Sequence, residues 1–424
     1  MINGQKIILT TFAGRRDRMK LLLSYARAAL SLGIIDEWHV WDFARTPEDR
    51  QWLTEEFPNL RWIGDKKEHR FLGWAQQDGQ GKSRLEFGVR GASNIHIQVA
   101  SQNPSAPQLL LVLGAEDNTI SQLYSLDTNK NPIEATLLAS VATPGLLSAQ
   151  LTKQCVIDYA QGTLKLSING YSIFSHNIDY GGQLIGAVLC AGNGGPCEIY
   201  LPKLADSKQF LFVAENKDAH PYSEFYNYYE QRYSEYKNCV FLKCDDDILY
   251  INLIKLRDFI AFRIQNPWYF LVSANVVNNN VCAYYQQQSQ LIPYGLMSVD
   301  LPPNGFGGKL WEDGGLAETL HNWFLDEPER FIGHNFRQIS IEWSQRLSIN
   351  FIAFLGKDLA EMACRFKDDE HALSIEIPHR LGRTNAIFTP FIVSHLSFYT
   401  QNAEMNIGEI INRYEALRDQ VIRV

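Results

Sequence analysis

Several features that would assign this chain to a class at once are missing from its 424 residues. Its seven cysteines form no Cys-x-x-Cys pair, which argues against a structural zinc site and favours reduced thiols. No apolar run reaches ~18 residues, the length that a membrane-spanning helix needs. The first residues, Met1–Leu9, lack the apolar core of a signal peptide. We therefore expect a cytoplasmic protein without a transmembrane segment.

An excess of positive charge is also missing. Lysine and arginine number 39 against 47 acidic residues, which gives a net charge of −8 and argues against nucleic acid as a partner. The composition, 46% hydrophobic and 20% charged, is typical of globular proteins. At roughly 150 residues per domain, the length suits more than one domain.

The first 67 residues alternate between strand-like and helix-like patterns. The expected elements are Lys6–Thr11, Arg18–Leu32, Trp38–Phe43, Pro47–Phe57 and Leu60–Ile63. Strand, helix, strand, helix, strand favours a parallel sheet of the nucleotide-binding type, with ligands at the carboxyl ends of the strands.

Helical patterns disappear between residues 68 and 205. Short apolar or alternating segments follow one another there, separated by turn residues such as Asn169–Gly170, which predicts an all-β sandwich or jelly roll. The α/β pattern returns after residue 206. The predicted fold class is therefore α/β, a Rossmann-like domain in two parts (1–67 and 206–424) interrupted by a β-sandwich insertion (68–205).

Three consecutive carboxylates, Asp245, Asp246 and Asp247, stand between the apolar segments Val240–Leu242 and Ile248–Ile251. Most acidic triplets are solvated loops or helix starts, but carboxylates at the end of a buried strand need a cation. Oxygen ligands suit Mg2+ or Mn2+, and a site with few protein ligands leaves room for substrate phosphates. The pattern indicates a metal-bridged diphosphate, as in a nucleotide-sugar. Asp245 and Asp247 share a face if the chain is extended, but the spacing leaves open which aspartates bind the metal and which contact the ribose.

Residues at the ends of the first two strands are candidates for nucleotide-sugar binding. Ala13 and Gly14 permit a close approach of the backbone, and Arg15 or Arg16 can face a phosphate. An exposed basic helix start explains the arginines equally well. Asp42 is either a ligand of the base or ribose or a turn residue.

Later polar residues extend this candidate set. Asn275 follows an apolar run and suits sugar hydroxyls, although a polar turn is the more common role of such a pattern. Arg380 and Arg383 can neutralise a departing diphosphate. His395 is a further candidate metal ligand, or a histidine satisfied in the core.

Glu312 and Asp313 precede a predicted helix and follow a glycine-rich loop. An inverting sugar transfer needs a carboxylate that accepts the proton of the acceptor hydroxyl. Either residue is a candidate for this base, while the alternative is that Asp313 caps the helix.

Three motifs together resemble a known family. Lys243–Ile251 resembles the Lys-x-Asp-Asp-Asp strand of GT-A glycosyltransferases, Trp311–Asp313 resembles their acidic motif, and Ser394–Phe398 resembles the segment with their late metal-binding histidine. Over 1–67 and 206–424 the chain resembles bacterial cell-surface polysaccharide glycosyltransferases. The resemblance implies a GT-A fold and a hexosyltransferase that uses Mn2+ or Mg2+ on Asp245, Asp247 and His395. The donor would be a nucleotide-sugar, UDP-linked, and the acceptor a glycan.

Two other functions compete with this interpretation. The first is a glycan-binding protein with an inactive transferase core, and the second is a metal-dependent phosphohydrolase, which would release phosphate instead of an intact nucleoside diphosphate.

The predicted insertion resembles the farnesoic acid O-methyltransferase-like domain, chiefly in Leu85–Ile97 and Leu111–Gly114. The segment has no glycine-rich cofactor loop after a strand and no α/β pattern for a methyl donor. We therefore expect a β-sandwich binding module, for the acceptor glycan or for self-association into a homo-oligomer.

Overall fold

The structure is a computed structural model, and it describes most of the chain in two compact units. The described residues are 1–57, 59–64, 69–74, 76–77, 82–101, 108–127, 134–180, 185–191, 197–201, 208–214, 221–302, 307–333, 338–341, 345–362 and 368–422. Unit 1 comprises Met1–Glu56, Lys208–Phe210 and Lys217–Val424, and unit 2 comprises Phe57–Ser207 and Leu211–Asn216. The predicted domain boundaries, at 67/68 and 205/206, lie outside the described residues.

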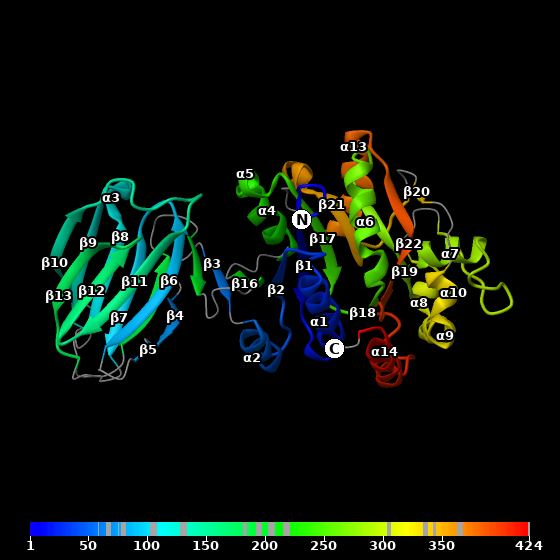
Figure 1. Ribbon diagram of the computed structural model, residues 1–424, viewed down its shortest axis with the longest axis horizontal. Helices are drawn as coiled ribbons and strands as arrows, with labels where there is room; N and C mark the ends of the chain where they lie inside the picture. The colour runs from blue at the N-terminus through cyan, green and yellow to red at the C-terminus, as the bar shows by residue number, and fades with distance from the viewer. Residues whose placement is uncertain are drawn as a thin grey trace. The chain divides into compact units, whose positions relative to one another are not determined.

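Unit 1 is built on a mixed sheet, with β1 between β2 and β17 (Figure 1). Its strands follow the order β2-β1-β17-β21-β19-β22-β18, and β20 pairs with β22. The pairs β1–β2, β1–β17 and β19–β22 are parallel, whereas β21 and β18 pair antiparallel with their neighbours. The bounds are β1 Lys6–Ala13, β2 Glu37–Asp42, β17 Cys239–Asp245, β18 Ile248–Ile251, β19 Val272–Val277, β20 Ile339–Ile341, β21 Phe351–Leu355 and β22 Asn385–His395.

Helices surround this sheet because their apolar stripes match its buried faces. The first, α1, buries Met19, Leu22 and Tyr25 and packs against β18. The bounds are α1 Arg16–Ser31, α2 Pro47–Glu56, α4 Pro221–Gln231, α5 Tyr233–Tyr236, α6 Leu253–Gln265, α7 Asn280–Gln288, α8 Lys309–Glu312, α9 Gly314–Asp326, α10 Pro328–Ile332, α11 Leu359–Met362, α12 Asp369–His371, α13 Ile377–Leu381 and α14 Ile407–Val421. A 3-10 turn spans Gly356–Asp358 and a π turn spans Ala372–Glu376. None of the described helices is both long and apolar enough to cross a membrane.

Unit 2 consists of two sheets, and in some of its strands, such as Lys153–Ala160 and Thr163–Ile168, buried residues alternate with more exposed ones. Their orders are β13-β12-β11-β6-β15-β3-β16, with β5 on β6, and β10-β9-β8-β7-β14-β4; β16 belongs to this unit from Leu211 on. Among the described strands of this unit β3 and β16 pair in parallel and the other pairs are antiparallel, and α3 (Ala115–Asn118) is the helix found among its described residues. The bounds are β3 Leu60–Gly64, β4 His69–Trp74, β5 Gln76–Gln77, β6 Ser83–Gly91, β7 Ile95–Ser101, β8 Gln108–Gly114, β9 Ile120–Asp127, β10 Glu134–Ala142, β11 Lys153–Ala160, β12 Thr163–Ile168, β13 Tyr171–Asn177, β14 Ile185–Ala191, β15 Cys197–Leu201 and β16 Gln209–Ala214.

The predicted fold class, an α/β GT-A domain interrupted by a sandwich, is wrong. The chain is mostly β-sheet, and the sheet of unit 1 is mixed instead of parallel. The error arose at the third predicted strand: β3 pairs with β15 and β16 in unit 2 and not beside β1 or β2. A strand-helix alternation fixes which elements form, but it does not fix which strands pair.

A partly buried ionic cluster between β1 and β2 gives a stability prediction. Glu37 accepts from the ring of His39 at 3.0 Å and pairs with Lys6 at 2.7 Å. Burial alone would raise the pKa of Glu37, but the His39 hydrogen bond and the Lys6 charge outweigh it and lower the pKa to about 2. The stabilisation is therefore complete above pH ~4.5 and is lost as the pH falls towards 2.

We expect Glu37→Gln to lower the free energy of unfolding by about 2 kcal/mol at pH 7, and by much less near pH 2.5. Urea unfolding at the two pH values measures the difference. Glu55→Gln, on the exposed part of α2, serves as the control. A destabilisation that is the same at both pH values would exclude a charge effect.

Candidate metal and diphosphate site

The acidic triplet forms the end of β17 and the turn into β18. Asp245 is the last residue of β17, and Asp246 and Asp247 form the turn. The side chains of Asp246 and Asp247 are buried, and that of Asp245 is partly exposed. The prediction of three carboxylates at the end of a buried strand is confirmed.

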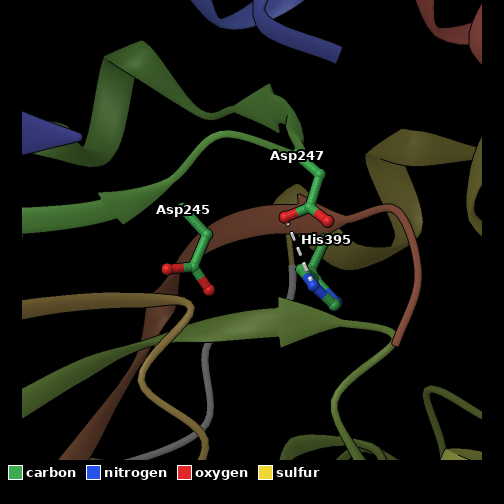
Figure 2. A group of neighbouring side chains, drawn as sticks. All are labelled: Asp245, Asp247 and His395. Atoms are coloured by element: carbon green, nitrogen blue, oxygen red, sulfur yellow. Dashed lines mark ion pairs between the residues drawn. The ribbon is translucent and has the colours of Figure 1, made fainter. Parts of the chain in front are cut away.

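His395 completes a group that can hold a metal ion. It ends β22, and antiparallel pairing of β22 with β18 sets it opposite Ile248, directly after the triplet. Ligand atoms of Asp245, Asp247 and His395 lie within 4.8 Å of one another. In Figure 2 the carboxylate of Asp247 points towards the His395 ring, and Nε2 lies 3.4 Å from Oδ1. Carboxylate oxygens with one imidazole fit a divalent cation such as Mn2+.

Two arginines from the start of α1 neutralise the turn. Arg15 pairs with Asp246 and, through Nη2, with Asp247 Oδ2 at 2.9 Å, while Arg18 Nη1 donates to the same oxygen at 3.1 Å. Burial alone would raise the pKa of Asp247, but His395, Arg15 and Arg18 outweigh it and lower the pKa. The charge of Asp247 is thus already stabilised in the folded chain.

Asp246 has a different role from its neighbours. Its Oδ2 accepts from the backbone N–H of Gly14 at 2.8 Å, and Arg15 binds the same carboxylate. A Cβ at position 14 would lie 3.1 Å from the carbonyl oxygen of Phe43 and 3.3 Å from Asp246 Oδ2. A larger residue at position 14 would therefore be crowded, and Asp246 holds the end of β1 while Asp245 and Asp247 lie near His395.

Asp245 is held by Lys243 and Asn350. Lys243 is buried, and its Nζ donates to Asp245 Oδ1 at 3.1 Å, while Asn350 donates to Oδ2 at 3.2 Å. Burial lowers the pKa of Lys243, but the charges of Asp245 and Asp369 outweigh this and raise it. The lysine stays charged and fixes the orientation of the carboxylate.

These side chains line a pocket of about 410 Å³ in unit 1. This volume suits a small-molecule ligand. Aromatic rings of Phe12, Phe43 and Tyr222 form part of the wall, and Phe43 and Tyr222 are stacked at 5.5 Å. Asp369 and Glu370 also line it. No motif pointed to Asp369 or Glu370, whereas Tyr222 belongs to a helix that is rich in aromatic residues.

Some predicted ligands of the nucleotide-sugar lie elsewhere or are engaged. Ala13 is buried in β1, Arg16 is exposed on α1, and neither lines the pocket. Asp42 pairs with Arg50 at 3.0 Å and accepts from Ala44 N–H, as a turn residue does. Among the predicted residues before β3, Gly14 and Arg15 line the pocket.

The later candidates also have structural partners. Asn275 donates to the carbonyl oxygen of Thr389 and accepts from Gln286 in the core. Arg380 pairs with Glu361 at 2.8 Å, and Arg383 with Asp358 at 2.7 Å. None of the three predicted residues lines the pocket.

The two candidates for the catalytic base, Glu312 and Asp313, are exposed. Asp313 caps α9 by accepting from Leu316 N–H at 2.9 Å, which is the capping role that the sequence also allowed. Glu312 and Asp313 do not line the pocket, but the ring of Trp311 lies 5.3 Å from that of Tyr399, which does. The catalytic role of the two carboxylates stays a prediction.

Comparison with known proteins supports one of the two predicted resemblances. A family model described as farnesoic acid O-methyl transferase matches residues 65–177, so the resemblance of this segment is confirmed. Curated proteins include no significant match. The predicted membership of the GT-A polysaccharide glycosyltransferases is wrong: the family model that matches is a different one, and the similar structures described below are β-rich carbohydrate-binding proteins.

Three solved structures illustrate this. A carbohydrate-binding module from Bacillus subtilis is 8% identical over 32% of this chain and 94% of its own, with a TM-score of 0.21. Sheep galectin-11 in complex with glycerol is 8% identical over 32% and 95%, at 0.22. A tetrameric galectin from the ball sponge Cinachyrella is 11% identical over 30% and 94%, at 0.23. At these TM-scores the likenesses do not decide what this chain does.

Proposed function

We propose that this protein binds glycans and that the pocket of unit 1 binds a nucleotide-sugar through a divalent cation, Mn2+ or Mg2+. The observation that carries the proposal is the group of Asp245, Asp247 and His395 on the wall of a pocket that also contains cationic and aromatic side chains. Asp245 and Asp247 would hold the ion with His395, and the ion would supply charge neutralisation for a diphosphate.

The rest of the pocket suits the other parts of such a ligand. Phe43 and Tyr222 offer a flat aromatic surface for a base or a sugar ring. At another part of the wall Tyr399 is 77% exposed beside Trp311, and exposed aromatic rings of this kind suit the apolar face of a glycan. Self-association through unit 2 stays a prediction.

Transfer of the sugar to a glycan is the second candidate, in which the protein is a hexosyltransferase. The packing of Trp311 against Tyr399 favours it, because this contact brings the segment with Glu312 and Asp313 next to the pocket wall. One of these carboxylates would take the proton of the acceptor hydroxyl as its oxygen attacks the anomeric carbon. The bond to the diphosphate would break with its electron pair on the leaving oxygen.

Calorimetry with a panel of nucleotide-sugars tests the proposal, with Mn2+ and then with EDTA. We expect at least one donor to bind, and EDTA to abolish the binding. If no donor binds in a metal-dependent way, the proposed function is wrong. Adding glycans and analysing the products separates the candidates: intact nucleoside diphosphate indicates transfer, inorganic phosphate a phosphohydrolase, and no turnover a binding protein.

A further inference from the structure

Arg45 is a cation on the pocket wall whose charge has no partner among the described residues. It lies between β2 and α2, and its backbone N–H donates to the carbonyl oxygen of Gly14 at 3.2 Å. Its guanidinium makes no ion pair or hydrogen bond within the part of the chain that the structure describes. The backbone is therefore fixed while the charged group remains available.

The other cations on this wall are already engaged. Arg15 pairs with Asp246 and Asp247, and Lys243 pairs with Asp245. Arg18, behind the turn, pairs with Asp247. Each of these positive charges is needed to offset a carboxylate, so none is in surplus for a ligand.

The position of Arg45 relates it to the metal-capable group. A Cβ built on Gly14 would meet both Arg45 Nε, at 3.6 Å, and Asp246 Oδ2, at 3.3 Å. Arg45 and the acidic turn therefore border the same side of Gly14. Arg45 also acts on the pKa of Tyr222, which burial raises and Arg45 opposes. Arg45 thus lines the same pocket as the acidic turn and Tyr222.

We infer that Arg45 binds the phosphate groups of the ligand, in place of the arginines that the sequence favoured. The inference rests on the proposed function. A diphosphate carries several negative charges, and one divalent cation held by two carboxylates offsets only part of them. A planar guanidinium can donate two parallel hydrogen bonds to phosphate oxygens. Arg16, Arg380 and Arg383 lie outside the pocket lining, and Arg15 already forms ion pairs with Asp246 and Asp247.

The test compares Arg45→Ala with Arg16→Ala, because both arginines are exposed and only Arg45 lines the pocket. Binding of uridine, uridine monophosphate and uridine diphosphate is measured by calorimetry with Mn2+, and binding of guanosine diphosphate is measured beside it. We expect Arg45→Ala to lower the affinity for the two diphosphates by ~10- to 100-fold, the usual cost of losing hydrogen bonds to a charged group. The affinity for uridine should change little. Arg16→Ala should bind like the unmodified protein, and Arg45→Lys should keep part of the affinity.

The outcomes separate the inference from the proposed function. If the unmodified protein binds no nucleoside diphosphate with Mn2+, the proposed function fails. If it binds, and Arg45→Ala binds equally well, the inference alone is overturned. An equal loss for diphosphate and nucleoside would also overturn it, because that pattern indicates an altered pocket. Circular dichroism and the thermal midpoint of each variant check that the fold is intact.

Discussion

The Asp247→Asn variant is expected to lose at least ~100-fold in affinity for Mn2+, and with it the metal-dependent binding of any nucleotide-sugar. Asparagine keeps the size of the side chain but removes the negative charge that faces His395 Nε2 at 3.4 Å. Loss of a metal ligand is expected to cost more than the ~10- to 100-fold that loss of an outer-shell partner costs. Titration of free Mn2+ by electron paramagnetic resonance measures the affinity without a turnover assay.

Asp246→Asn is the matched variant, because it makes the same chemical change at the next residue. The carboxylate of Asp246 is engaged by Gly14 N–H and Arg15, so we expect Mn2+ affinity to fall by only ~10-fold, the lower end of an outer-shell effect. Both variants leave an arginine with a weaker partner, and their thermal midpoints must therefore be compared. Unchanged affinity in Asp247→Asn, or an equal loss in both variants, would refute the assignment of the ligands.

The Gly356→Ala variant is expected to destabilise unit 1 by about 3 kcal/mol or more. Gly356 follows β21, and a Cβ there would lie 1.9 Å from the carbonyl oxygen of Tyr236 and 3.1 Å from that of Cys239. Both contacts are with backbone, which cannot move aside as a flexible side chain can. Relief would require β21 to shift against the start of β17, the strand that ends in Asp245.

Gly408→Ala provides the comparison for this variant. A Cβ at Gly408, in the first turn of α14, meets nothing within 4 Å. Alanine favours a helix over glycine by roughly 0.5–1 kcal/mol, so this variant should be slightly more stable than the unmodified protein. If the packing of Gly356 is as described, urea unfolding shows a lower free energy of unfolding for Gly356→Ala and a slightly higher one for Gly408→Ala. Similar urea midpoints for both variants would show that the backbone around Gly356 moves at little cost in free energy.

Local sequence patterns predicted the strand end that carries the site. A buried apolar run, three carboxylates and a second apolar run place the aspartates between β17 and β18, since each part of the pattern is contiguous in the chain. The same reasoning placed β1, α1, β2 and α2. It also placed β3, but it assigned this strand to the wrong sheet, because the partner of a strand is decided by residues far away in the sequence.

Assigning roles to single residues depended on contacts that spacing does not encode. Asp313 fitted both a base and a helix cap, and the structure shows the cap. Arg380 and Arg383 had the right chemistry, but each pairs with a nearby carboxylate. Arg45 carried no motif and was not predicted, although it lines the pocket.

The sequence by itself determined that three aspartates follow a buried apolar run and that the segment 68–205 has a distinct, β-rich character. Only the tertiary structure decided that His395 lies beside Asp247, that Asp246 holds Gly14, and that Arg15 and Arg18 neutralise the turn. The physical reason is that charge and apolar runs are local properties, whereas the β18–β22 register and the docking of α1 arise from pairing between distant segments. The lack of Cys-x-x-Cys pairs and of excess positive charge argued against a zinc protein and a nucleic-acid-binding protein. The pairing of distant strands assembled the site.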